Sequence, residues 1–67
     1  MNRKEFIEIR FESIKDIIVK QIKLMVDNEF PQHMMNAVIR DIIKASTKLY
    51  KFDKNQVNEL KKLANLS

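Results

Sequence analysis

The stretch FIEIRFES at residues 6–13 decides the fold, because two different structures fit it. As an extended segment it alternates with a period of two, which is typical of a half-buried strand. In that arrangement one side carries Ile7, Ile9 and Phe11, and the other carries Phe6, Glu8, Arg10 and Glu12. As a helix, the same stretch begins an apolar stripe at spacings of three and four residues. The members of that stripe are Ile7, Phe11, Ile14, Ile18, Ile22 and Met25.

A local start signal favours a strand over residues 6–12. The hydroxyl of Ser13 can accept a hydrogen bond from the backbone N–H near Asp16, and an acidic residue suits the positive end of a helix. A helix over residues 13–27 then leaves residues 6–12 free to be a strand. If the whole segment is helical, Asn2 and Glu5 form an alternative cap at its start.

Two further helices are predicted after this segment. Pro31 disfavours helical geometry at Phe30 and suits the first position of the next helix, which we place over residues 31–50. The chain has no glycine, so Asn28 is the expected left-handed residue of the turn. Asp53 and Gln56 predict a capping box at the start of a short third helix, residues 54–65. Residues 1–67 thus read as a single domain.

The small size of the chain predicts a homodimer. A domain of 67 residues buries only about 60% of its unfolded surface, and without cysteine it has no disulfide to supplement its core. Association of two chains is the remaining supplement. Val19, Leu24 and Val26 widen the apolar face of the first helix beyond what a lone surface helix needs, as expected for packing against a second chain.

Composition argues against several classes of protein. There is no glycine-rich phosphate loop, no cysteine nucleophile and no evident Ser–His–Asp relay, so we expect neither an enzyme nor a cofactor. With one histidine and no cysteine, we expect no metal site. No apolar run approaches the roughly 18 residues of a membrane-spanning helix. A cytoplasmic location is expected, since a chain without cysteine fits a reducing compartment.

Strand, helix, Pro-containing turn and helix together resemble the ribbon-helix-helix repressors over about residues 5–45. The similarity rests on the segment Ile-Glu-Ile-Arg-Phe at residues 7–11 and on the run from Ala37 to Ile43. The resemblance implies a mainly α, obligate dimer with an added C-terminal helix. In that family, two N-terminal strands pair into a ribbon that enters the DNA major groove. The alternative fold class is an all-α three-helix bundle.

The resemblance also implies DNA-contacting residues. Phe6, Glu8 and Arg10 would face the groove, where the Arg10 guanidinium could bind guanine O6 and N7. Backbone N–H groups of Gln32 and His33, at the start of the second helix, would hold a phosphate. Arg3 and Lys4 would add phosphate contacts from the N-terminal arm.

Charge distribution keeps a second function open. Residues 1–30 carry six basic and six acidic side chains, whereas residues 31–67 carry seven basic and three acidic ones, for a net charge of +4. A ribbon that reads DNA would therefore lie in the neutral half of the chain. The first hypothesis is a small homodimeric DNA-binding regulator or copy-control repressor. The second is an all-helical module that binds a host protein, without DNA, through a Met-bearing surface or the basic set Arg40, Lys44, Lys48 and Lys51.

Overall fold

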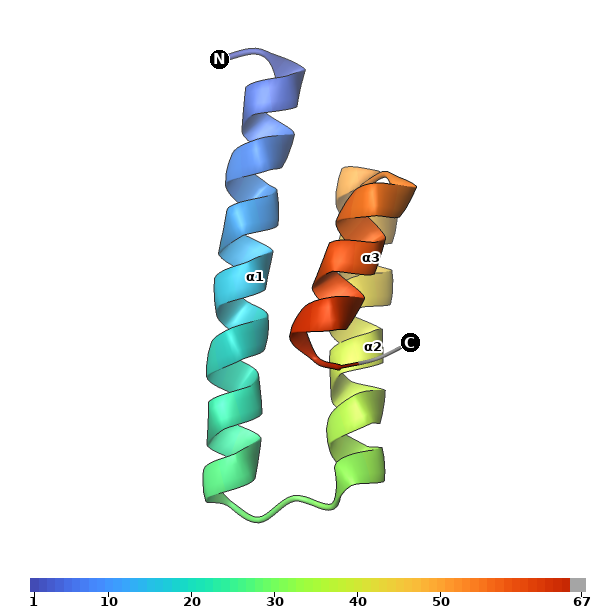
Figure 1. The fold of residues 1–67 in the computed structure, drawn as a ribbon. Helices are drawn as coiled ribbons and strands as arrows, with labels where there is room; N and C mark the ends of the chain where they lie inside the picture. The colour runs from blue at the N-terminus through green and yellow to red at the C-terminus, as the bar shows by residue number, and fades with distance from the viewer. Residues whose placement is uncertain (66–67) are drawn as a thin grey trace.

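The computed structural model describes residues 1–65 and contains three helices in that range. They are α1 (Arg3–Asp27), α2 (Gln32–Tyr50) and α3 (Lys54–Leu63). Helices α1 and α2 form a long antiparallel hairpin, and the short α3 turns back beside both of them (Figure 1). The molecule measures 41 × 19 × 16 Å.

Helix α1 replaces the predicted strand over residues 6–12, so the predicted ribbon-helix-helix fold is wrong. Helix α1 starts at Arg3, where the Glu5 N–H donates to the Asn2 side-chain oxygen at 2.8 Å, and this confirms the alternative cap. Ser13 lies inside the helix, and its hydroxyl donates back to the Ile9 carbonyl at 3.1 Å instead of capping a helix start. Among residues 1–65 every regular element is a helix, as in the all-α alternative.

Burial along α1 follows the helical period. Phe11, Ile18 and Met25 are buried, whereas Ile9 is 50% exposed. A strand would have placed Ile9 on the same side as Ile7 and Phe11. Three other members of the predicted helical stripe are partly buried against the core: Ile7, Ile14 and Ile22. The stripe therefore holds along its whole predicted length.

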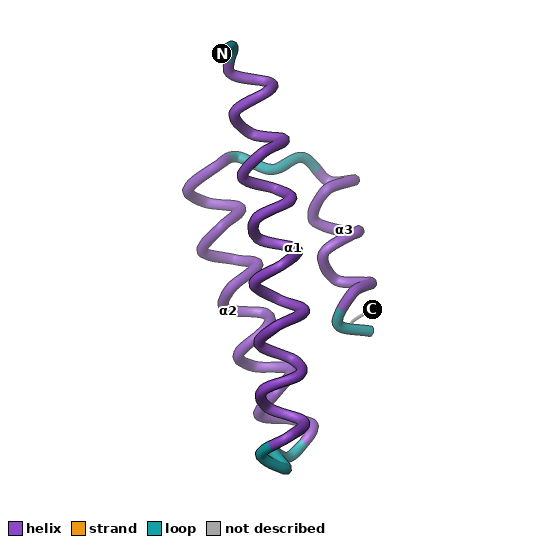
Figure 2. Tube along the Cα trace, turned by 90° about the vertical axis from the view of Figure 1, so that its left-hand side faces the viewer, coloured by secondary structure: helices purple, strands orange, loops and turns teal. Residues whose placement is uncertain are grey.

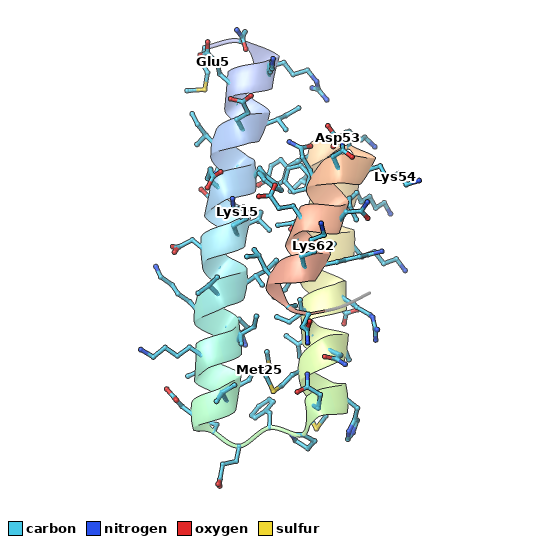
Figure 3. All side chains as sticks on the ribbon, in the orientation of Figure 1. Glu5, Lys15, Met25, Asp53, Lys54 and Lys62 are labelled. Atoms are coloured by element: carbon cyan, nitrogen blue, oxygen red, sulfur yellow. The ribbon has the colours of Figure 1, made fainter. Side chains whose placement is uncertain are left out.

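Side chains from all three helices and from the α2–α3 connection meet in one core. Its buried apolar members are Phe11, Ile18, Met25, Ile39, Ile43, Phe52 and Leu60. Phe11 and Phe52 meet edge to face with ring centroids 5.5 Å apart, which attaches the connection to α1. Met25 lies below the end of α3 in Figure 3, where α1 and α2 pack against each other.

Both turns use left-handed residues other than glycine. Asn28 was expected to be the left-handed residue of the first turn, but its φ is −98° and Glu29 takes that role with φ 57°. The side chain of Asn28 instead donates to the Leu24 carbonyl at 2.7 Å. The second turn passes through Lys51, with φ 59°.

Helix α3 begins at the predicted capping box, which is confirmed. The Gln56 N–H donates to the Asp53 carboxylate at 2.8 Å, and the Asp53 N–H donates to the Gln56 side chain at 2.9 Å. The helix ends at Leu63, two residues before the predicted end. Helix α2 begins at Gln32, with Pro31 as its N-cap residue.

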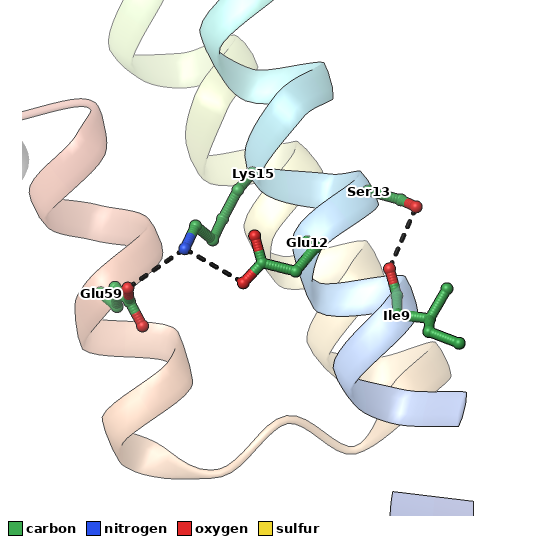
Figure 4. Close-up of polar contacts among 5 residues, drawn as sticks. All are labelled: Ile9, Glu12, Ser13, Lys15 and Glu59. Carbon is green, nitrogen blue, oxygen red and sulfur yellow. Dashed lines mark hydrogen bonds and ion pairs between the residues drawn. The ribbon is translucent and has the colours of Figure 1, made fainter. Parts of the chain in front are cut away.

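A branched ion pair joins α3 to α1. The Lys15 ammonium lies 3.3 Å from a carboxylate oxygen of Glu59 on α3 and 3.3 Å from one of Glu12 on α1 (Figure 4). The hydrogen bond to Glu59 is the main cause that raises the pKa of Lys15 above its ordinary value of 10.5. This side of α1 therefore faces α3.

The raised pKa of Lys15 predicts that replacing Glu59 lowers the stability of the protein near neutral pH but not at high pH. Because the charged lysine is favoured in the folded state, its contribution is complete below the ordinary pKa of 10.5 and is lost as the pH rises through the folded-state pKa. We expect Glu59→Gln to destabilise the protein at about pH 8. The difference from the wild type should shrink above pH 10.5. Urea denaturation of both proteins across this range measures it.

A second lysine with a raised pKa, Lys20, does not affect the difference between the wild type and Glu59→Gln. The pKa of Lys20 is also raised, through its hydrogen bond to Asp16, but this pair is the same in both proteins and cancels in the difference. A stability difference that stayed constant across the whole pH range would show that Lys15 does not respond to Glu59.

Candidate functional site

The residues expected to contact DNA lie at opposite ends of the molecule. One group lies in the first turns of α1: Arg3, Lys4, Phe6, Glu8 and Arg10. The other group, Gln32 and His33, opens α2 at the end where α1 and α2 are joined. Figure 1 places the start of α1 and this turn at the two ends of the 41 Å long axis. The structure therefore does not bring the two groups into one surface.

Several of these side chains interact with other parts of the protein. The Arg10 guanidinium carbon lies 5.4 Å from the centroid of the Phe6 ring, and that ring lies 6.3 Å from Tyr50. The Gln32 amide donates to the Asn36 side chain at 2.8 Å. Arg10 is thus stacked on a side chain of its own helix, and the segment that carries it is not a strand.

A groove between α2 and α3 collects the excess basic charge. Its volume is about 510 Å³, within the range of ligand-binding clefts. It is lined by Arg40, Ile43, Lys44, Thr47, Lys48, Val57 and Lys61. We call this surface the cationic groove. Four of its seven lining residues are cations and none is acidic.

The cations of the groove have no acidic partners in the described part of the chain. Arg40, Lys44 and Lys48 follow one another at intervals of four residues, so they lie near one another along α2. Lys61 faces them from α3. The ion pairs formed among residues 1–65 involve only Lys15 and Lys20 on α1. The groove therefore keeps an uncompensated positive potential.

The rest of the groove lining is apolar, with one unsatisfied hydroxyl. Ile43 is buried and Val57 is partly buried. The hydroxyl oxygen of Thr47 is buried and has no hydrogen-bond partner among residues 1–65. A helical threonine often donates back to the carbonyl one turn earlier. Leaving such a group unsatisfied costs about 1–3 kcal/mol.

The sequence revealed only one wall of this groove. The spacing of Arg40, Lys44 and Lys48 is visible in the chain, and these residues belonged to the predicted basic set. Lys51, the fourth member of that set, instead borders a separate hollow of about 270 Å³ beside Lys4 and Glu8. Lys61 was missed, since only the docking of α3 brings it opposite α2. No local signal in the chain could have located it there.

Other classes of site are not found among the described residues. Residues 1–65 hold no group of three or more His, Cys, Asp or Glu side chains placed to share a metal ion. In the same range, no helix combines the length and apolarity needed to cross a membrane. Comparisons with protein-family models, curated proteins and solved structures found no match for the chain.

Proposed function

We propose that this protein is a non-catalytic helical binding module whose cationic groove receives an acidic, amphipathic helix of a partner protein. The observation that supports this is the combination of four cations without acidic partners and an apolar floor in one groove. The charges select an acidic partner and steer it toward the groove. The floor selects a partner that also carries apolar side chains.

The spacing of the cations suits a helical partner. Arg40 and Lys48 are eight residues apart, which corresponds to about 12 Å along the axis of α2. A helix with an acidic residue in each of three successive turns presents carboxylates over the same distance. Such a helix would lie beside α2 and α3 and extend the bundle by one member, which is a common way for an amphipathic helix to be recognised.

The apolar floor favours a protein partner over a nucleic acid. A DNA duplex offers phosphates to Lys44 and its neighbours, but its backbone has no apolar side chain to cover the partly exposed Val57. The ribbon that would have entered the major groove is a helix in this protein, so Arg10 has no strand from which to read bases. The cationic groove therefore supports the hypothesis of an all-helical module that binds a protein.

A designed peptide tests the proposal directly. The probe is an acidic amphipathic peptide of about three or four turns, with glutamates one turn apart and leucines on the adjoining face. We expect Lys44→Glu to weaken its binding about fivefold to tenfold, because an attraction of up to about 1 kcal/mol becomes a repulsion. Isothermal titration calorimetry with the full chain measures the change.

Lys23→Glu is the matched control for charge. Lys23 is an exposed lysine on α1, outside the groove, and the substitution changes the net charge by the same amount. The peptide should bind this variant about as well as it binds the wild type. Equal weakening by both substitutions would show that net charge alone attracts the peptide.

A second peptide tests the apolar floor. Replacing the leucines of the probe by glutamine keeps its charge but removes the apolar groups that would cover the partly exposed Val57. The proposal fails if this peptide, or a DNA duplex, binds as tightly as the original probe, since the groove would then be a general polyanion site.

A further inference from the structure

We propose that the face of the α1–α2 hairpin opposite α3 joins two copies of this chain into a homodimer. Among the exposed large apolar residues of the described chain, five belong to this face by their positions on the two helices: Phe6, Ile17, Leu24, Met34 and Leu49. We call it the open face. The inference does not depend on the cationic groove, which lies on the side of α2 next to α3.

Residue positions on α1 show which side of the helix the open face occupies. Lys15 reaches Glu59, so its side of α1 faces α3. Successive helical residues are rotated by about 100°, which places Ile17 and Leu24 on the other side of the buried stripe that contains Ile18. Figure 2 shows α3 on one side of α1 and α2 on the other, with no helix of the described chain covering the far side of the hairpin.

Helix α2 carries a second apolar stripe that lies on the same side. Its members are spaced by three or four residues: Met34, Val38, Ile42, Ala45 and Leu49. The groove residues Arg40 and Thr47 mark the opposite side of α2, next to α3. Both stripes thus lie on the side of the hairpin away from α3, and in the α2 stripe Val38 and Ile42 are already partly buried against the core.

The chemistry of the open face favours a second copy over a charged partner. Arg10 interrupts the α1 stripe, and it is stacked on Phe6. The ion pair of Lys20 and Asp16, 2.8 Å long, lies beyond the edge of the stripe on the outer side of α1. A surface with so little charge does not distinguish acidic from basic partners. Two copies of such a surface can meet without bringing many like charges together, as a two-fold symmetric interface requires.

The size of the open face and the small size of the core both favour a second copy of the chain as the partner. The long faces of the molecule measure 41 Å by 19 Å or 16 Å, so an interface of the standard size, roughly 800 Å² per partner, would extend over the whole length of the hairpin. The core has only seven buried apolar side chains in the described residues. A chain this small gains stability from association, and the five exposed apolar side chains of the open face are groups that a second copy would cover.

A dimer formed in this way leaves both cationic grooves accessible. The groove and the open face lie on different sides of α2, so one does not cover the other. Two grooves in one dimer could engage two acidic segments of a single partner at once, which raises the apparent affinity without new contacts.

Sedimentation velocity of the full chain over a range of concentrations tests the inference. We expect the wild type to sediment as a dimer. Ile17→Asp places a charge in the centre of the interface and should raise the dimer dissociation constant by roughly thirtyfold or more. Val19→Asp is the matched control, because Val19 is 51% exposed and Ile17 is 48% exposed, yet Val19 lies on the α3 side of the same helix. This control should remain dimeric.

Leu49→Lys provides a second variant with little effect on folding, since Leu49 is the most exposed member of the face, and it should also give monomers. Far-UV circular dichroism checks that each variant keeps its helices. The inference is overturned by a wild type that is monomeric at about millimolar concentration, which would place any self-association below useful strength. It is equally overturned by a dimer that survives both Ile17→Asp and Leu49→Lys, or by one that Val19→Asp dissociates as strongly as Ile17→Asp.

Discussion

Ile18→Ala is expected to lower the free energy of unfolding by about 2–5 kcal/mol. Ile18 is 0% exposed, at the middle of the apolar stripe of α1, and its loss leaves a cavity that the surrounding side chains fill only in part. The core of a domain below about 70 residues rarely supplies more than 3–5 kcal/mol. A large fraction of the variant should therefore be unfolded at room temperature. Urea denaturation followed by circular dichroism, at one fixed protein concentration, measures the loss.

Ile9→Ala is the matched control for this prediction. The chemical change is identical and lies on the same helix, but Ile9 is 50% exposed. We expect a loss within about 0.5 kcal/mol, as is usual for surface substitutions. The comparison also separates the two structures of residues 6–12, since a strand would make Ile9 a core residue. Similar losses for Ile9→Ala and Ile18→Ala would contradict the helical stripe.

Leu60→Ala is expected to release α3 from the hairpin. Leu60 is fully buried and is the buried residue of α3. Helix α3 has 10 residues, too few to remain helical alone in water, so its structure depends on this contact. The substitution should cost about 2–5 kcal/mol and remove the amide protection of Lys54–Leu63. Hydrogen exchange measured by NMR resolves this loss helix by helix.

Leu63→Ala makes the same chemical change three residues later, at a position that is 39% exposed. It should leave the protection of α3 nearly unchanged. If α3 stayed protected after Leu60→Ala, the docking of this helix would depend on other contacts, such as Lys15 with Glu59.

Loss of α3 would also remove the cationic groove. Val57 and Lys61 form the α3 side of the groove, so Leu60→Ala should abolish binding of the acidic probe peptide. The open face uses only α1 and α2. If Leu60→Ala abolishes peptide binding but affects dimerisation less, the cationic groove and the open face are separate binding surfaces.

Local chemistry predicted the capped start of α3, but for α1 it gave the observed cap at Asn2 only as the alternative to a start at Ser13. Asn2 and Asp53 each accept a hydrogen bond from a backbone N–H three residues later, and such a bond depends only on neighbours in the chain. The apolar stripe of α1 was also visible, because its spacing matches the helical period.

Tertiary structure decided what the local pattern left open. Residues 6–12 satisfy both the period of a strand and that of a helix, and the hydroxyl of Ser13 can either cap a helix ahead of it or bond to a carbonyl behind it. In the folded chain Phe11 packs against Phe52, more than 40 residues away, while Ile9, which a strand would bury beside Phe11, is 50% exposed. The same long-range packing places Lys61 opposite Lys44 and leaves the open face uncovered. The cationic groove and the open face both depend on the side of the hairpin against which α3 packs. Side-chain spacing within one helix carries no information about which side a neighbouring helix occupies.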